Sequence, residues 1–203
     1  MRPTSSKKRP IDRRVQRSRQ LLQDALIAMM MEKGYEATTV QDIIDRANVG
    51  RATFYAHFAD KETLLASRLE DLRAMLAQRQ RVVLAGSGGP TERSLGFSLA
   101  MIEHAGSHLR LYQSISGRKS GTYVLQRIHR MIAELAAAEL ATAAPKNSPL
   151  QRDLAAQYVA GAFMAVLTWW LDHGAQMPPA DVDLIVRRLV TPGLTAGLRT
   201  PDS

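Results

Sequence analysis

The chain has 203 residues, a net charge of +8 at pH 7 and no cysteine. Its length suits one large domain or two small ones, with ample chain for a sizeable core, and we expect two small domains. The absence of cysteine excludes disulfides, thiolate nucleophiles and Cys-ligated zinc, and it fits a protein of the reducing cytosol.

The positive charge is concentrated at the N-terminus. Residues 1–19 carry eight Lys or Arg residues against Asp12, a net charge of +7, and the rest of the chain is nearly neutral. We interpret residues 1–17 as a flexible basic arm that would add phosphate contacts to a neighbouring nucleic-acid-binding motif. The alternative is a solvated tail that only aids solubility. No apolar run suited to a signal peptide follows the arm, so we do not expect export.

The first predicted helix runs from Val15 to Lys33. Its apolar side chains recur at the spacing of one helix face, and Gly34 stands where a helix often ends. The residues of this face are Leu22, Leu26, Met29 and Met30. We expect the helix to complete a three-helix unit with the two that follow.

The stretch from Thr38 to Lys61 predicts two short helices joined by a tight turn. Thr39 can cap the first helix, and Asp42 three residues later can complete a capping box. After a three-residue break, helical spacing resumes from Arg51 to Phe58. The order helix, turn, helix is that of a helix-turn-helix motif.

The outer face of the second short helix consists mainly of hydrogen-bond donors, which suit an anionic partner. In a helix-turn-helix protein this helix enters the DNA major groove. Arg51 would then read a base, because its fork can bond guanine O6 and N7 together. Thr53 would contact a base edge or a thymine methyl, whereas Tyr55, His57 and Lys61 would hold phosphates. The full predicted set of DNA-binding residues is Thr38, Thr39, Arg51, Ala52, Thr53, Tyr55, His57 and Lys61.

Several short motifs follow one another through this region. They are Gly34-Tyr35, Thr38-Thr39-Val40, Ala47-Asn48-Val49-Gly50, Thr53-Phe54-Tyr55-Ala56-His57-Phe58 and Asp60-Lys61-Glu62. Together they resemble the DNA-binding domain of TetR-type bacterial transcriptional regulators. Gly50 departs from the pattern, because many members carry Ser there, and the change removes a helix cap. The resemblance implies an all-α protein with an N-terminal three-helix DNA-binding domain and a C-terminal helical domain for ligand binding and dimerisation.

Asp60 is expected to cap a long fourth helix that connects the two domains. Its length suggests a rod, so that a shift at its far end would move the DNA-reading end. The segment Gly86-Ser87-Gly88-Gly89-Pro90 is the clearest break in the chain. The predicted divisions are the arm at residues 1–17, the helix-turn-helix domain at 18–64, the connecting helix at 65–85 and the regulatory and dimerisation domain at 86–203.

The second domain is predicted to be entirely helical. Helical patterns occupy about Thr91–His104, Ser107–Ser114, Thr122–Thr142 and Leu150–His173, and a last helix capped by Asp181 is kinked or interrupted at Pro192-Gly193. The longest apolar segment, Val159–Leu171, falls short of the roughly 20 residues that span a bilayer, so we interpret it as part of a buried helix.

The helix from Leu150 to His173 carries two apolar stripes offset by one residue. Val159, Phe163, Val166 and Trp170 form one of them. One stripe can face the core of the domain while the other faces a partner chain. The run from Trp169 to Gly174, followed by a Pro turn, also resembles C-terminal domains in part of the TetR family, which implies a homodimer built on the last two helices. The predicted interface residues are Leu154, Tyr158, Gly161, Ala165, Trp169, Ile185 and Leu189.

The family resemblance also implies a small-molecule pocket in the second domain. Candidate lining residues, apolar with a few polar tips, are Phe97, Met101, His104, Tyr123, Phe163, Leu167 and Trp170. The alternative is that they are ordinary core residues. His104 and His108 lack a third ligand in the pattern, so no metal or other cofactor is expected. Catalytic motifs are also missing from the sequence, and we predict no enzymatic activity.

These observations predict a cytoplasmic, sequence-specific DNA-binding regulator without membrane contact. The main hypothesis is a dimeric repressor that a small-molecule effector releases from a pseudo-palindromic operator on double-stranded DNA. A first alternative is a DNA-bound interaction module whose helical domain binds a protein partner instead of a metabolite. A second is non-specific binding to nucleic acid or anionic membranes through the basic arm.

Overall fold

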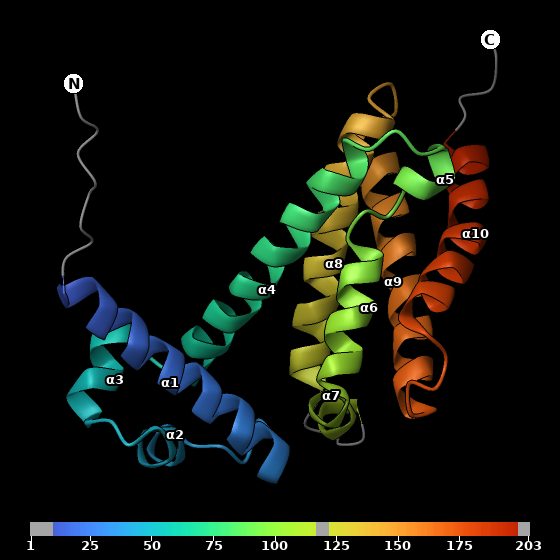
Figure 1. Cartoon of the computed structure of the whole chain (residues 1–203). Coiled ribbons are helices and arrows are strands. Elements are labelled where there is room, and N and C mark those ends of the chain that lie inside the picture. Colours follow the sequence, from blue (N-terminus) through green and yellow to red (C-terminus); the bar gives the residue numbers. More distant parts are fainter. Residues whose placement is uncertain (1–9, 117–121, 199–203) are drawn as a thin grey trace, which may run out of the picture. The chain divides into compact units, whose positions relative to one another are not determined.

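The computed structural model describes residues 10–116 and 122–198. Within these ranges all regular secondary structure is α-helical, which confirms the predicted fold class (Figure 1). The chain divides into two compact units, Met1–Arg68 and Leu69–Ser203.

The first unit begins with α1 (Pro10–Lys33), which starts earlier than predicted. Residues 10–17 form its first turns and are not part of a flexible arm. Pro10 suits this place, because the backbone donor that proline lacks has no partner in the first turn of a helix. Residues 1–9 of the predicted arm lie outside the described residues.

The two short helices, α2 (Val40–Ala47) and α3 (Arg51–His57), are joined by the predicted turn. The capping box of α2 is confirmed: Thr39 Oγ1 accepts a bond from the Asp42 N–H at 3.2 Å, and Asp42 Oδ2 accepts one from the Thr39 N–H at 2.7 Å. Asn48 ends α2 in the left-handed region with φ 50°, a conformation that asparagine tolerates better than most residues.

The long helix α4 (Lys61–Leu84) follows the predicted cap. Asp60 Oδ1 accepts a bond from the Thr63 N–H at 2.6 Å, which confirms that cap. Residues of α4 up to Arg68 belong to the first unit. Apolar side chains from α1 to α4 and the segments between them form the core of this unit, and their burial is its main driving force. They are Leu22, Leu26, Met30, Ile43, Ile44, Phe54, Phe58, Leu64 and Leu65.

The second unit continues α4 and adds a set of helices of very different lengths. They are α5 (Pro90–Arg93), α6 (Ser98–Ser107), α7 (Leu109–Ser116), α8 (Thr122–Ala143), α9 (Pro149–Asp172) and α10 (Pro179–Gly197). α8 packs along α9, and α6 packs against α10 (Figure 1). The single helix predicted at Thr91–His104 is wrong, because α5 and α6 are separate.

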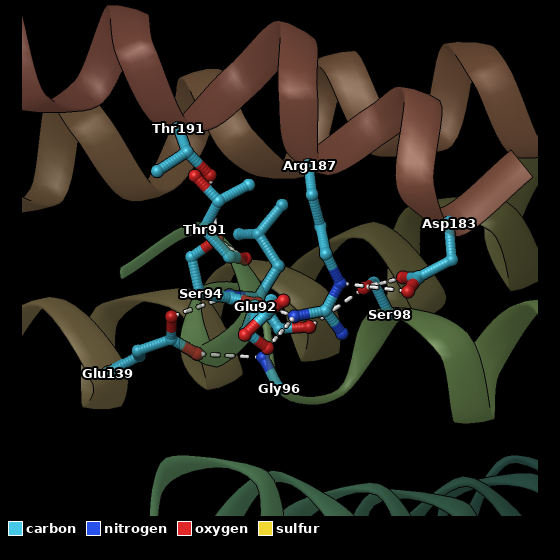
Figure 2. Close-up of polar contacts among 10 residues, drawn as sticks. Thr91, Glu92, Ser94, Gly96, Ser98, Glu139, Asp183, Arg187 and Thr191 are labelled. Atoms are coloured by element: carbon cyan, nitrogen blue, oxygen red, sulfur yellow. Dashed lines mark hydrogen bonds and ion pairs between the residues drawn. The ribbon is translucent and has the colours of Figure 1, made fainter. Parts of the chain in front are cut away.

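Buried polar groups hold the loop that separates α5 from α6. Leu95 has a left-handed φ of 48°, and its N–H donates to the Glu139 carboxylate at 2.6 Å. The Gly96 N–H and Gln80 Nε2 donate to the same carboxylate at 3.1 and 3.0 Å. Figure 2 shows Glu139 facing Gly96 from α8. Helical periodicity could not predict this break, because the carboxylate that stabilises it lies on a distant helix.

Arg187 and Asp183 of α10 hold the same loop from another side (Figure 2). Arg187 Nε donates to Asp183 Oδ2 at 2.8 Å, and its Nη1 donates to the carbonyl oxygens of Glu92, at 2.9 Å, and Ser94. The Ser98 hydroxyl donates to the Asp183 carboxylate. Both charged side chains are buried, and their charges are matched by this pairing.

α10 differs from the prediction at two places. Its N-cap position is Pro178, so Asp181 lies in the first turn and does not cap the helix. The helix also continues through Pro192 and Gly193, so the predicted interruption is wrong, whereas the alternative of a kink stays a prediction. Pro192 lies in the last turns of α10, where its missing N–H and the crowding of its ring disturb few hydrogen bonds, and its side chain is exposed.

α9 is long and apolar enough to cross a membrane by length and composition, and it extends beyond the apolar run Val159–Leu171. It nevertheless packs against α7, α8 and α10. Its buried side chains are Ala155, Ala156, Val159, Ala160, Phe163, Leu167, Trp170 and Leu171. These contacts are those of a core helix, as the sequence predicts.

Candidate nucleic-acid interface

Two aromatic side chains fix the orientation of α3. Phe54 is fully buried and Phe58 nearly so, and their ring centroids lie 6.1 Å apart. With this side of the helix in the core, Arg51, Ala52 and Tyr55 are exposed. Gly50 at the N-cap position provides no side-chain cap, as the departure from the family pattern predicts.

The guanidinium of Arg51 has partners on both short helices. Arg51 Nη1 donates to Gln41 Oε1 on α2 at 3.4 Å, and Arg51 Cζ lies 5.7 Å from the centre of the Tyr55 ring. The second distance is in the range of a cation–π contact. Gln41 was not among the predicted DNA-binding residues, although its place in the first turn of α2 and its amide are both typical of residues near DNA.

The remaining donors of α3 are partly exposed. Thr53 is half-buried. His57 is also half-buried, and its Nε2 lies 2.7 Å from the hydroxyl of Ser18 on α1. This bond orients the imidazole, and the phosphate contact of His57 stays a prediction.

Lys61 has a different environment from the one predicted. Its ammonium donates to the carbonyl oxygens of Tyr35, Glu36 and Thr38 at 3.0, 3.3 and 2.9 Å, and it lies 4.6 Å from the centre of the Tyr35 ring. An ammonium has three N–H donors, so a phosphate contact would require it to release one of these carbonyls. In this structure the bonds from Lys61 stabilise the segment between α1 and α2.

The two threonines before α2 support the fold. Thr38 is 1% exposed, and its hydroxyl donates to the Gly34 carbonyl at 2.7 Å. The Thr38 side chain therefore faces the core, and the place of Thr38 among the DNA-binding residues stays a prediction. Thr39 is exposed, but its hydroxyl is bonded to Asp42 in the cap.

Asp42 should make the first unit sensitive to acid. Bonds from the Lys33 ammonium, at 2.7 Å, and from Thr39 hold the pKa of Asp42 well below its usual value. A depressed folded pKa means that the carboxylate stabilises the fold above its unfolded pKa of about 3.9, and that this contribution is lost as the pH falls towards the folded pKa.

We therefore expect Asp42→Asn to be less stable than the wild type at pH 6, with the difference shrinking as the pH falls from about 5 towards 2. Urea unfolding followed by circular dichroism at several pH values measures it. The matched control is Asp24→Asn, which alters an exposed carboxylate of α1 bonded to the neutral Gln20. A stability difference that stays constant over this pH range would contradict the assignment.

The candidate ligand-lining residues lie mainly in the core of the second unit. Phe97, Met101, Phe163, Leu167 and Trp170 are buried, whereas His104 and Tyr123 are half-buried. The rings of Phe97 and Phe163 meet edge to face with centroids 5.6 Å apart. A pocket formed by this set stays a prediction.

Trp170 is held in place by backbone groups. Its Nε1 donates to the Met177 carbonyl at 2.9 Å. A Cβ on Gly106 would lie 2.8 Å from Trp170 Cη2, so the indole needs glycine at this position.

The imidazoles of His104 and His108 stack with centroids 4.4 Å apart. Within the described residues, no group of three His, Asp or Glu side chains could hold a metal ion.

The two apolar stripes predicted on α9 differ in their exposure to solvent. Val159, Phe163 and Trp170 are buried and Val166 is half-buried. The other stripe is exposed, with Leu154 at 71% and Trp169 at 54%. All the predicted interface residues, namely Leu154, Tyr158, Gly161, Ala165 and Trp169 on α9 and Ile185 and Leu189 on α10, are exposed. Which partner covers this face stays a prediction.

Two family models match separate parts of the chain. The model described as "Bacterial regulatory proteins, tetR family" matches residues 22–67, which contain α2 and α3. The model described as "Transcriptional regulator C-terminal region" matches residues 92–192. The matched regions lie one in the first unit and one in the second.

Two relatives of the chain are named as HTH-type transcriptional regulators. The chain is 35% identical over 94 residues to the HTH-type transcriptional repressor KstR2 of Mycobacterium tuberculosis, covering 45% of this chain and 47% of that protein. It is 29% identical over 177 residues to the uncharacterized HTH-type transcriptional regulator YxbF of Bacillus subtilis, covering 85% of this chain and 44% of that protein. The chain thus spans about half the length of these curated relatives.

Solved structures share the whole fold. A TetR-family transcriptional regulator from Syntrophomonas wolfei superposes with a TM-score of 0.70 at 20% identity, covering 89% of this chain and 96% of that one. The repressor FadR of Thermus thermophilus, solved in complex with lauroyl-CoA, superposes with a TM-score of 0.59 at 17% identity. This match covers 91% of this chain and 97% of the FadR chain. At these identities the likeness concerns the fold alone.

Proposed function

Because the chain belongs to the TetR family of bacterial regulatory proteins, we propose that it is a transcriptional repressor that binds a specific DNA sequence. The observation that carries this proposal is the face of α3 on which Arg51 and Tyr55 are exposed while Phe54 anchors the helix in the core. An exposed guanidinium at the start of a recognition helix is suited to a guanine in the major groove.

The repressor would act as a homodimer on a pseudo-palindromic operator. One short recognition helix reads only a few base pairs, whereas specific binding exceeds non-specific binding by about 10³ to 10⁷. Two copies related by a twofold axis would place their recognition helices about 34 to 36 Å apart, one turn of DNA. The exposed apolar face of α9 and α10 supports this assembly, because such a face is costly to leave in water.

A small-molecule effector would control DNA binding from the second unit. The buried aromatic side chains Phe97, Phe163 and Trp170, with the half-buried His104 and Tyr123, are the proposed lining. The protein would act in the cytoplasm as a regulator and not as an enzyme. The alternative in which the helical domain binds a protein partner has no support among the relatives.

The direct test is a fluorescence-anisotropy titration of the full chain against DNA from upstream of its own gene. It is made at two salt concentrations, with random duplex as the competitor. Binding that survives competition, at two chains per site, supports a specific dimeric regulator. Equal and strongly salt-sensitive binding to both duplexes would contradict it for this DNA and favour phosphate contacts by the basic arm.

We expect Arg51→Ala to weaken operator binding by about 1 to 3 kcal/mol, because it removes a bidentate contact to one guanine. Binding to random duplex should change much less, since phosphate contacts dominate there. Titrations with operators mutated at single base pairs would locate the affected step. Unchanged operator affinity in this variant would rule out Arg51 as a base reader.

A further inference from the structure

Gln41 links the two helices of the helix-turn-helix motif at its surface. Its Nε2 donates to Asp45 Oδ1 at 2.8 Å, one turn further along α2. Its Oε1 accepts the bond from Arg51 Nη1 at 3.4 Å. The carboxylate accepts from the amide nitrogen, and this arrangement turns the amide oxygen towards the guanidinium. All three side chains are exposed.

Tyr55 restricts the same guanidinium from α3 itself. Arg51 Cζ lies 5.7 Å from the centre of the Tyr55 ring. That ring is in turn held edge to face against the buried Phe54, with centroids 5.3 Å apart. The Arg51 side chain therefore has one partner on each of two helices, and both partners are themselves oriented by a further residue.

This arrangement leaves the reading edge of Arg51 available. A guanidinium carries five N–H donors. One bond from Nη1 to Gln41 leaves the edge formed by Nε and Nη2, whose two donors match guanine O6 and N7. An arginine that is already oriented loses less rotamer freedom when it binds.

We propose that Gln41 is a positioning residue for base reading by Arg51, and thereby a determinant of specificity at that one base step. The inference rests on the proposed function. Gln41 acts through the guanidinium, so its contribution exists only where Arg51 is present and where the operator carries the guanine that Arg51 reads. A purely structural role for Gln41 in α2 would weaken binding to every duplex alike.

The test is a double-mutant cycle on a duplex that the wild-type protein selects from a random library. Wild type, Gln41→Ala, Arg51→Ala and the double variant are titrated by fluorescence anisotropy at one salt concentration. Each is also titrated against duplexes in which single G·C pairs are replaced by A·T. We expect Gln41→Ala to lose about fivefold in affinity for the selected duplex, the loss typical of one hydrogen bond. The loss should disappear in the Arg51→Ala background and on the duplex that lacks the guanine read by Arg51.

Gln20→Ala is the matched control, because Gln20 Nε2 donates to Asp24 Oδ1 at 2.8 Å on the exposed face of α1. It removes the same kind of intrahelical bond away from α3 and should bind as the wild type does. A Gln41→Ala loss that persists in full beside Arg51→Ala, or no loss at all, would overturn the inference while leaving the proposed function intact. A wild-type protein that binds the selected duplex no better than random duplex would overturn the proposed function and the inference together.

Discussion

Arg187→Ala is expected to destabilise the second unit by about 3 to 5 kcal/mol, the usual cost of removing one partner from a buried ion pair. Asp183 and Arg187 are only 8% and 6% exposed. Without the guanidinium, the Asp183 carboxylate keeps the bond from Ser98 but loses its only counter-charge among the described residues. The carbonyl oxygens of Glu92 and Ser94 lose a donor at the same time.

Urea unfolding followed by circular dichroism measures this effect. The control is Arg188→Ala, which removes the exposed neighbouring arginine of the same helix and should change the free energy of unfolding by less than about 0.5 kcal/mol. Replacing Asp183 and Arg187 together by leucine should restore much of the loss, because no buried charge then remains unpaired. Similar stabilities for Arg187→Ala and Arg188→Ala would show that the pair is not buried in solution.

Leu154→Glu combined with Leu189→Glu is expected to abolish the homodimer and to lower operator affinity by at least about 10²-fold. Leu154 on α9 and Leu189 on α10 are 71% and 66% exposed, so carboxylates there are solvated in the monomer and do not disturb its core. In a dimer that covers this face, the same carboxylates would be buried without partners. Loss of the second recognition helix removes the gain of about 10² to 10⁴ that two linked binding sites provide.

Light scattering of the purified variant reports the mass, and anisotropy reports operator affinity. Val82→Glu is the matched control, because Val82 is an exposed apolar residue of α4, outside the predicted interface. It should leave both the mass and the affinity unchanged. A double variant that remains dimeric would mean that another face joins the two chains.

Local sequence patterns predicted the elements whose stabilising partners lie within a few residues. Thr39 and Asp42 are three residues apart, as are Asp60 and Thr63, and both caps are present. The two stripes of α9 also followed from periodicity, since the repeat of a helix determines which side chains share a face. Phe163 of one stripe is buried and Leu154 of the other is exposed, as predicted.

Other features depend on partners far away in the chain, which periodicity does not encode. Lys61 is hydrogen-bonded to carbonyl groups that precede it by 23 to 26 residues. These bonds could not be predicted from the residues around Lys61. The helix expected at residues 91–104 is broken because the Glu139 carboxylate, 43 and 44 residues away, accepts the N–H groups of Gly96 and Leu95. A buried carboxylate requires donors, and the packing of α8 against this loop and against Gln80 of α4 provides them.

The DNA-binding face also combines features that local sequence predicts with features that depend on tertiary packing. The spacing of Phe54 and Phe58 was enough to assign the buried side of α3, and with it the exposure of Arg51 and Tyr55. The burial of Thr38 and the bond between Arg51 and Gln41, ten residues apart on different helices, depend on how α1, α2 and α3 pack together. Helix periodicity determines which way a side chain points, whereas the side chain that it meets is decided by tertiary packing.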